Sequence, residues 1–140
     1  MLVKEVMSKS IDILQPTSSL KYAAEHMKNG DFGFMPVSEN GRILGVLTDR
    51  DIATRAVANG KDPNKTNVSD VMTKQVHSCH EKDDIKNIAQ QMEKLQIRRL
   101  MVLNENEKPT GIVSLGDIAR KCNDNTLCGE IIQSVSEELH

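Results

Sequence analysis

Residues 45–53 read GVLTDRDIA, and residues 111–119 read GIVSLGDIA. Each stretch is a short apolar run that ends at a hydroxyl residue, with an aspartate three positions later. A short apolar run is typical of a buried strand, and the [ST]-x-x-[DE] spacing predicts a helix that begins at the hydroxyl. The chain therefore contains the same strand-to-helix junction twice.

The repetition extends well beyond these two junctions. A shift of 65 positions aligns VKEVMSK at 3–9 with VSDVMTK at 68–74, and after one insertion the offset becomes 66. Self-similarity at a fixed period indicates a supersecondary unit that is completed by its copy. Each half has only about 55 residues, close to the lower limit for independent folding. We therefore expect the two halves to pack together.

Both copies show the same order of local signals. In the first copy, Thr17-Ser18-Ser19 offer N-cap hydroxyls for a helix that should stop at Gly30. Asn40-Gly41 favours a tight hairpin between two strands. The expected elements are strand 11–14, a helix with Leu20, Ala23, Ala24 and Met27 on its apolar side, strands 35–37 and 43–47, and a helix from Thr48 with Ile52, Ala53, Ala56 and Val57. In the second copy they are strand 76–79, a helix with Ile85, Ile88, Ala89, Met92 and Leu95, strands 100–103 and 110–114, and a helix from Leu115.

These signals set the predicted domain limits. The first repeat is expected at 1–60, a linker at 61–67 and the second repeat at 68–122. A tail at 123–140 should hold a helix over 130–139 that docks on the pair or on a second subunit. Its apolar residues are Ile131, Ile132, Val135 and Leu139.

Composition narrows the range of partners. The chain has 140 residues, a formal net charge of -2 and 27% charged residues, which is typical of a globular protein without a field that attracts nucleic acid. It has neither a long apolar run nor the layout of a signal peptide, so we expect a cytoplasmic protein that does not cross a membrane. Three cysteines without a C-x-x-C spacing favour reduced thiols over a disulfide framework.

The paired hydroxyl and acid have two interpretations. Thr48 with Asp51, and Ser114 with Asp117, match a capping box, in which each side chain bonds a backbone N–H of the other residue. A hydroxyl at a helix start can also donate to phosphate, and a carboxylate can accept from the two hydroxyls of a ribose. The second interpretation predicts a nucleotide site in each repeat.

The doubled G-apolar-apolar-[ST]-x-x-D-[IL] unit resembles a tandem pair of CBS domains, the cystathionine-β-synthase-type regulatory repeat. The openings VKEVMSK and VSDVMTK and the strand Arg98-Arg99-Leu100-Met101-Val102 resemble this family as well, with Met101 where proline is usual. The similarity covers about residues 1–122. It implies an α+β fold of two βαββα repeats, related by a pseudo-twofold axis in a disc, the arrangement called a Bateman module.

The resemblance also implies two clefts between the repeats that hold AMP, ADP or ATP, and in some members S-adenosylmethionine. Asp51 and Asp117 would then accept from ribose hydroxyls, while Thr48 and Ser114 would contact phosphate. Residues of the first strand in each repeat would frame adenine, with one residue of the next strand alongside. These framing residues are Ile11, Ile13, Val76, Ser78, Met35 and Leu100.

The two sites differ in charge. Arg50 stands beside Asp51, whereas the second repeat has Leu115-Gly116 at the corresponding places. Arg98 and Arg99 stand where the first repeat has Gly33 and Phe34, and strand alternation predicts that at most one of them reaches a ligand. From Arg50 we predict that the Asp51 site is the better phosphate binder.

The leading hypothesis is a non-enzymatic adenine-nucleotide sensor without a cofactor, which acts through a homodimer or a separate target protein. One alternative is a structural module that dimerises without any ligand. An enzyme, for example a nucleotide hydrolase, is disfavoured because neither repeat has an activated nucleophile or a carboxylate cluster for Mg²⁺. A metal site at His77, Cys79 and His80 is also disfavoured, because strand alternation separates the three side chains.

Overall fold

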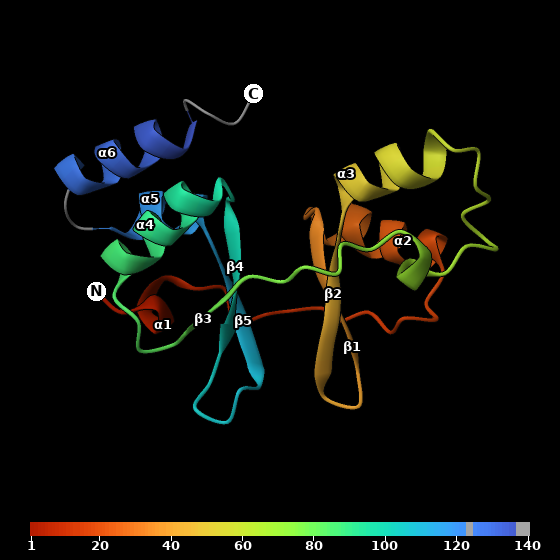
Figure 1. Ribbon diagram of the computed structural model, residues 1–140, viewed down its shortest axis with the longest axis horizontal. Helices are drawn as coiled ribbons and strands as arrows, with labels where there is room; N and C mark the ends of the chain where they lie inside the picture. The colour runs from red at the N-terminus through yellow and green to blue at the C-terminus, as the bar shows by residue number, and fades with distance from the viewer. Residues whose placement is uncertain (123–124, 137–140) are drawn as a thin grey trace. The chain divides into compact units, whose positions relative to one another are not determined.

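Two sets of residues pack into separate units in the computed structural model, which describes residues 1–122 and 125–136 (Figure 1). Residues 11–76 form one unit, here called the first-repeat unit. Residues 1–10 together with those from 77 onward form the other, the second-repeat unit. The predicted domain limits follow the repeat in the sequence, whereas the packing assigns the first ten residues to the unit of the second repeat.

The first-repeat unit contains a helix, a β-hairpin and a closing helical segment. The hairpin has the positive φ values expected of a tight turn, 53° at Asn40 and 77° at Gly41. Its strands pair antiparallel, with a bulge after Val37. The elements are α2 (Leu20–Gly30), β1 (Phe34–Glu39), β2 (Arg42–Thr48), α3 (Asp49–Asp51), the π-helix η1 (Ile52–Val57) and the 3₁₀ helix η2 (Val68–Asp70).

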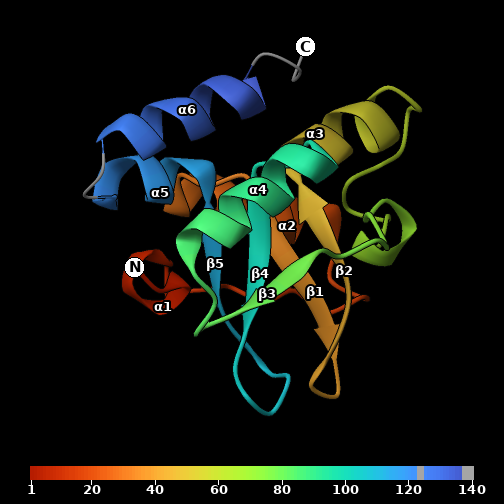
Figure 2. The same cartoon turned by 60° about the vertical axis from the view of Figure 1, so that its left-hand side comes forward.

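The second-repeat unit repeats this order around a three-stranded sheet. The sheet order is β3-β4-β5, with β3 parallel to β4 and β4 antiparallel to β5. Figure 2 shows α4 lying across this sheet, and α6 contacts both α4 and α5. The elements are α1 (Val3–Val6), β3 (Ser78–His80), α4 (Ile85–Leu95), β4 (Arg99–Leu103), β5 (Pro109–Ser114), α5 (Leu115–Lys121) and α6 (Asn125–Ser136).

The opening segment of each repeat packs on the sheet of the other repeat. Ser8 exchanges backbone hydrogen bonds with Ile112 at 2.8 and 3.0 Å, and Thr73 does the same with Val46 at 2.8 and 2.9 Å. Val3 and Val6 are fully buried in the second-repeat core, and Val68 is fully buried in the first-repeat core. Each unit is therefore completed by the opening segment of the other repeat.

Two glycines allow this close approach. A Cβ at Gly45 would lie 2.6 Å from the carbonyl oxygen of Thr73, and a Cβ at Gly111 would lie 2.6 Å from that of Ser8. Real Cβ atoms do not come this close to a backbone oxygen, so any side chain would displace the opening segment. The first residue of each quoted stretch is thus a glycine because another part of the chain lies against it.

Several predicted elements differ in detail. Residues 11–14 form no strand, and only Leu14 bridges to Val37, because the main chain on either side makes no ladder with β1. Helix α2 ends at Gly30, as predicted, and the residue that follows it in the left-handed region is Asp31, at φ 54°. Ala24, Ala53, Val57 and Leu95 were expected on apolar faces but are exposed, Val57 by 71%, because each lies beyond the edge of the buried stripe of its helix.

The prediction of reduced thiols is wrong for two of the three cysteines. Cys122, the C-cap residue of α5, and Cys128, in α6, form a disulfide, with their Cα atoms 6.4 Å apart. Spacing in the sequence could not show this pair, because the pairing depends on the contact between α5 and α6. Cys79 is a free, buried thiol, as expected.

The C-terminal helix begins earlier than predicted. It spans Asn125–Ser136 instead of 130–139, and Leu139 lies outside the described residues. The side chains of Ile131, Ile132 and Val135 are also outside the described part of the structure. Within that part, no helix is both long and apolar enough to cross a membrane.

Candidate functional site

The start of α3 is a complete capping box. The Thr48 hydroxyl accepts from the Asp51 backbone N–H at 3.1 Å, and Asp51 Oδ2 accepts from the Thr48 N–H at 3.0 Å. The capping interpretation of this motif is confirmed, and the hydroxyl hydrogen of Thr48 stays available because the oxygen acts here only as an acceptor.

Asp51 has two further neighbours from elsewhere in the first-repeat unit. The Thr73 hydroxyl lies 3.3 Å from both carboxylate oxygens, and Arg55 Nη1 lies 3.8 Å from Oδ1. The residue is only 7% exposed. The Asp51 carboxylate therefore contacts the start of its own helix, Arg55 one turn later, and Thr73 in the opening segment of the second repeat.

The start of α5 has the same capping box. The Ser114 hydroxyl accepts from the Asp117 N–H at 3.0 Å, and Asp117 Oδ2 accepts from the Ser114 N–H at 2.9 Å. Asp117 is 8% exposed, and its Oδ1 accepts from Arg120 Nη2 at 2.6 Å. The Arg120 side chain is 69% exposed, so the cation covers the carboxylate from the solvent side.

A pocket of about 300 Å³ lies beside this second box. Arg98 and Arg99 both line it, together with Ser114, Leu115 and Gly116. Strand alternation predicted that only one arginine would reach such a site, but β4 begins at Arg99, so Arg98 precedes the strand and does not follow its alternation. The Leu115 N–H donates to the Arg98 carbonyl at 2.9 Å, and this bond joins the two segments that line the pocket.

The corresponding place in the first-repeat unit has a different charge. Gly33 and Phe34 replace the arginines, and the Asp49 N–H donates to the Gly33 carbonyl at 3.0 Å. The Asp49 carboxylate lies against Gly33, where a Cβ would come within 2.5 Å of it. Arg50 is exposed beside this carboxylate. The first box thus has an acid where the second has two cations.

The predicted adenine-framing residues are dispersed within their units. Met35 and Leu100 are 1% and 0% exposed and belong to the cores, so only their main chain could face a ligand. Ile13 is 45% exposed and lines a separate pocket at the hairpin end of the first-repeat unit. Of the others, Ile11 and Val76 are half-buried and Ser78 is exposed.

Two basic side chains make stabilising contacts that were not predicted from the sequence. Arg55 donates to the carbonyls of Val71 and Met72 at 3.1 and 3.0 Å, and Lys121 donates to the carbonyl of Val6 at 3.2 Å. Arg55 and Lys121 are equivalent at the offset of 66, and each fastens the opening segment in its unit. The sequence did contain a signal for these contacts, namely a basic residue at equivalent positions of the two repeats.

The His77–His80 segment is arranged as part of the scaffold. Cys79 is 3% exposed, and burial followed by the nearby charge of Asp83 raises the pKa of its thiol to about 12. The His80 imidazole Nε2 lies 2.8 Å from Glu107 Oε1. Within the described residues, no group of three or more His, Cys, Asp or Glu side chains could hold a metal ion.

The CBS domain profile matches residues 3–58 and 68–124, so the chain belongs to the CBS domain family. The expected α+β fold with two CBS repeats is confirmed.

Individual relatives cover nearly the whole chain. The CBS domain-containing protein YhcV of Bacillus subtilis is 36% identical over 136 residues, which is 97% of this chain and 96% of YhcV. Hypoxic response protein I, solved with two coordinated zinc ions, is 30% identical, with a TM-score of 0.76 over 86% of this chain and 98% of that one. The CBS domain pair of protein MJ0100, solved with 5′-methylthioadenosine and S-adenosyl-L-methionine, is 29% identical, with a TM-score of 0.75 over 86% of this chain and 98% of that one.

Proposed function

We propose that this chain is a non-enzymatic regulatory module that binds an adenosine compound and passes its occupancy to a partner. The observation that carries the proposal is the pocket of about 300 Å³ in the second-repeat unit, where Arg98, Arg99 and Ser114 line the same space. The complex of the MJ0100 domain pair with two adenosine compounds supports the class of ligand. Such a ligand has a sugar, a base and, in nucleotides, a phosphate.

The second box offers a phosphate partner. The Ser114 oxygen accepts from the Asp117 N–H, so the hydroxyl hydrogen can donate to an anion. Arg98 adds a guanidinium, whose planar set of donors fits phosphate oxygens. Because these cations would repel a sulfonium, we propose AMP, ADP or ATP ahead of S-adenosylmethionine as the ligand of this site.

Asp117 offers the sugar partner. One carboxylate accommodates about four hydrogen bonds, and the bonds from Ser114 and Arg120 use only part of that capacity. Arg120 covers the carboxylate but is itself exposed, so it can move aside without disturbing the core. A ribose hydroxyl would then donate to the oxygen that Arg120 leaves.

The first box is proposed as the weaker site. Asp49 places a carboxylate where the second site has arginines, and this charge opposes a phosphate. Arg50 was expected to make this the better site. Asp49 is its neighbour in the sequence, however, and its negative charge offsets part of the attraction that Arg50 would exert on a phosphate. Asp51 and Thr48 would still accept a neutral nucleoside.

Calorimetry with AMP, ADP, ATP and S-adenosylmethionine tests the proposal. We expect micromolar affinity for a nucleotide, and a loss of about tenfold or more in Asp117→Asn, which keeps an oxygen for the cap but loses the charge. Asp51→Asn is the matched control and should bind the first equivalent of nucleotide unchanged. Equal nucleotide binding by wild type and Asp117→Asn would refute the proposed role of Asp117.

The competing proposal is a module that dimerises through its helices without any ligand. A thermal-shift panel separates the two, because nucleotides that bind only the folded state raise the melting temperature. If no adenosine compound shifts it and the chain is a dimer at every concentration tested, the structural alternative is correct. The homodimer, the target protein and the cytoplasmic setting all stay predictions, and light scattering tests the first of them.

A further inference from the structure

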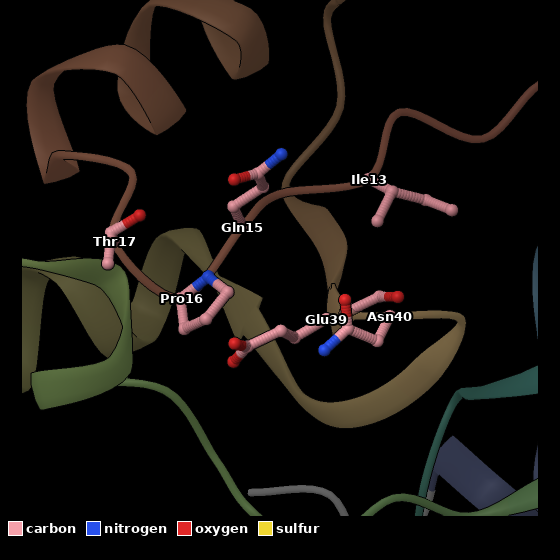
Figure 3. A pocket seen from close by; sticks show the side chains of 7 residues that line it. Ile13, Gln15, Pro16, Thr17, Glu39 and Asn40 are labelled. Atoms are coloured by element: carbon pink, nitrogen blue, oxygen red, sulfur yellow. The ribbon is translucent and has the colours of Figure 1, made fainter.

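A second pocket lies at the opposite end of the hairpin from the first capping box. Its volume is about 510 Å³, and it is lined by Ile13, Gln15, Pro16, Thr17, Ser38, Glu39 and Asn40. Figure 3 shows that these side chains come from two segments, the chain that leads into α2 and the end of β1 with its turn. Strand β2 separates this pocket from Thr48 by about 20 Å, at roughly 3.4 Å per residue.

The chemistry of the lining is that of an acceptor site with one negative charge. Among the described residues that line it, Glu39 is the one with an acidic side chain. Gln15 and Asn40 add amide oxygens, and Thr17 and Ser38 add hydroxyls. Ionised carboxylates only accept hydrogen bonds, whereas a primary ammonium has three donors and no acceptor.

The second repeat shows what the same place holds in the other copy. His80 and Lys82 are equivalent to Gln15 and Thr17 at the offset of 65. His80 Nε2 lies 2.8 Å from Glu107 Oε1, and Lys82 Nζ lies 2.6 Å from Glu105 Oε1. The second copy thus brings its own cations to the hairpin, and the first copy has a carboxylate with neutral residues at those positions.

We propose that the pocket around Glu39 binds a primary ammonium group. The ammonium would take the position that Lys82 Nζ has in the second repeat, with Glu39 as its charged partner. The apolar surfaces of Ile13 and Pro16 would contact the methylene chain of the amine. Two sources share this chemistry: a free polyamine, or a lysine side chain of a partner protein.

NMR titration at low salt tests the inference with cadaverine, spermidine and a short lysine peptide. We expect saturable shifts in the amide signals of Gln15, Thr17, Ser38 and Asn40. Cadaverine or spermidine acting alone would identify a free amine, and the peptide acting more strongly would identify a partner's lysine. The uncharged 1,5-pentanediol should cause no shift.

Three variants distinguish amine binding in the pocket from non-specific attraction of the amine to acidic residues elsewhere on the surface. Glu39→Gln should weaken amine binding about tenfold or more, because the charge-assisted bond is lost. Thr17→Lys copies the second repeat and should abolish binding by placing an internal ammonium beside Glu39. Glu105→Gln is the matched control and should bind like wild type. The inference is wrong if no amine shifts these signals at millimolar concentration, or if Glu39→Gln binds as well as wild type.

Discussion

The starts of α3 and α5 have the same hydrogen bonds but different surroundings. In both, the hydroxyl and the carboxylate each accept from the backbone N–H of the other residue, at 2.9–3.1 Å. Asp51 contacts the Thr73 hydroxyl and Arg55, and the Asp49 carboxylate lies nearby in the chain against Gly33. Asp117 pairs with Arg120, and the pocket with Arg98 and Arg99 adjoins its capping partner Ser114. The cap therefore fixes the start of both helices, whereas the charges beside the cap differ between the repeats.

The largest expected effect tests whether the two repeats are equivalent in their packing. Gly45→Ala and Gly111→Ala should each reduce the free energy of unfolding by about 1–3 kcal/mol, because the new methyl meets a backbone oxygen of the opening segment. Urea denaturation measures both. As a control, a Cβ at Gly129 in α6 would have no atom within 4 Å, so Gly129→Ala should be neutral or slightly stabilising. If only one of the first two is destabilised, the packing of the units is less alike than their hydrogen bonds indicate.

The next effect separates the two caps. Asp51→Ala and Asp117→Ala should each cost about 0.5–2 kcal/mol of stability, since a capping acceptor is lost. Asp51→Ala should lie at the upper end, because it also leaves the half-buried Thr73 hydroxyl without its carboxylate. Asp→Asn at either position should restore most of the loss. Thermal unfolding gives the order, and a greater loss for Asp117→Ala would reverse the interpretation of Thr73.

A smaller effect concerns the cations that fasten the opening segments. Arg55→Met removes hydrogen bonds to two carbonyls and should cost about 0.5–1 kcal/mol, because the group is about half exposed. Lys121→Met removes one longer bond and should cost less. Hydrogen exchange at Thr73 and Ser8 should report the loosening separately in each unit. Unchanged exchange in both variants would show that the valines alone hold these segments.

The smallest effect is electrostatic and is expected only in the second repeat. The hydrogen bond with Glu107 raises the pKa of His80, so the charged imidazole is favoured in the folded state. This stabilisation is complete below the ordinary pKa of histidine and is lost as the pH rises through the raised value. An NMR titration of Glu107→Gln should show a lower His80 pKa than wild type. An identical pKa in both proteins would mean that the contact is not maintained in solution.

Local patterns were sufficient to predict most of the fold. The hairpin at Asn40-Gly41 and the two capping boxes follow from residues within a few positions of each other. The contacts that could not be predicted join distant residues, such as Thr73 with Asp51 or Arg55 with Val71. The strand predicted at 11–14 was wrong for the same reason, because strand pairing depends on a distant part of the chain and not on the local pattern alone.

The candidate site divides in the same way. Thr48, Asp51, Ser114 and Asp117 were found from spacing alone, because a helix start requires them. The sequence showed Arg98 and Arg99 in place of Gly33 and Phe34, but it did not show that Asp49 lies against Gly33 or that both arginines line one pocket, because these depend on the fold around each helix start. The two helix starts were thus predicted from local spacing, whereas the charges beside them favour the Ser114 box over the Thr48 box for a phosphate, and which of the two binds better stays a prediction.

The exchange of opening segments has a consequence for synthesis on the ribosome. Residues 11–76 are contiguous, so this unit has all its residues once the first repeat and the start of the second have emerged. The other unit joins residues 1–10 to residues from 77 onward, so Val3 and Val6 must wait for nearly the whole chain before their core exists. We therefore expect vectorial folding in which residues 1–10 become protected only after the residues of their core, as far as Ile118, have emerged.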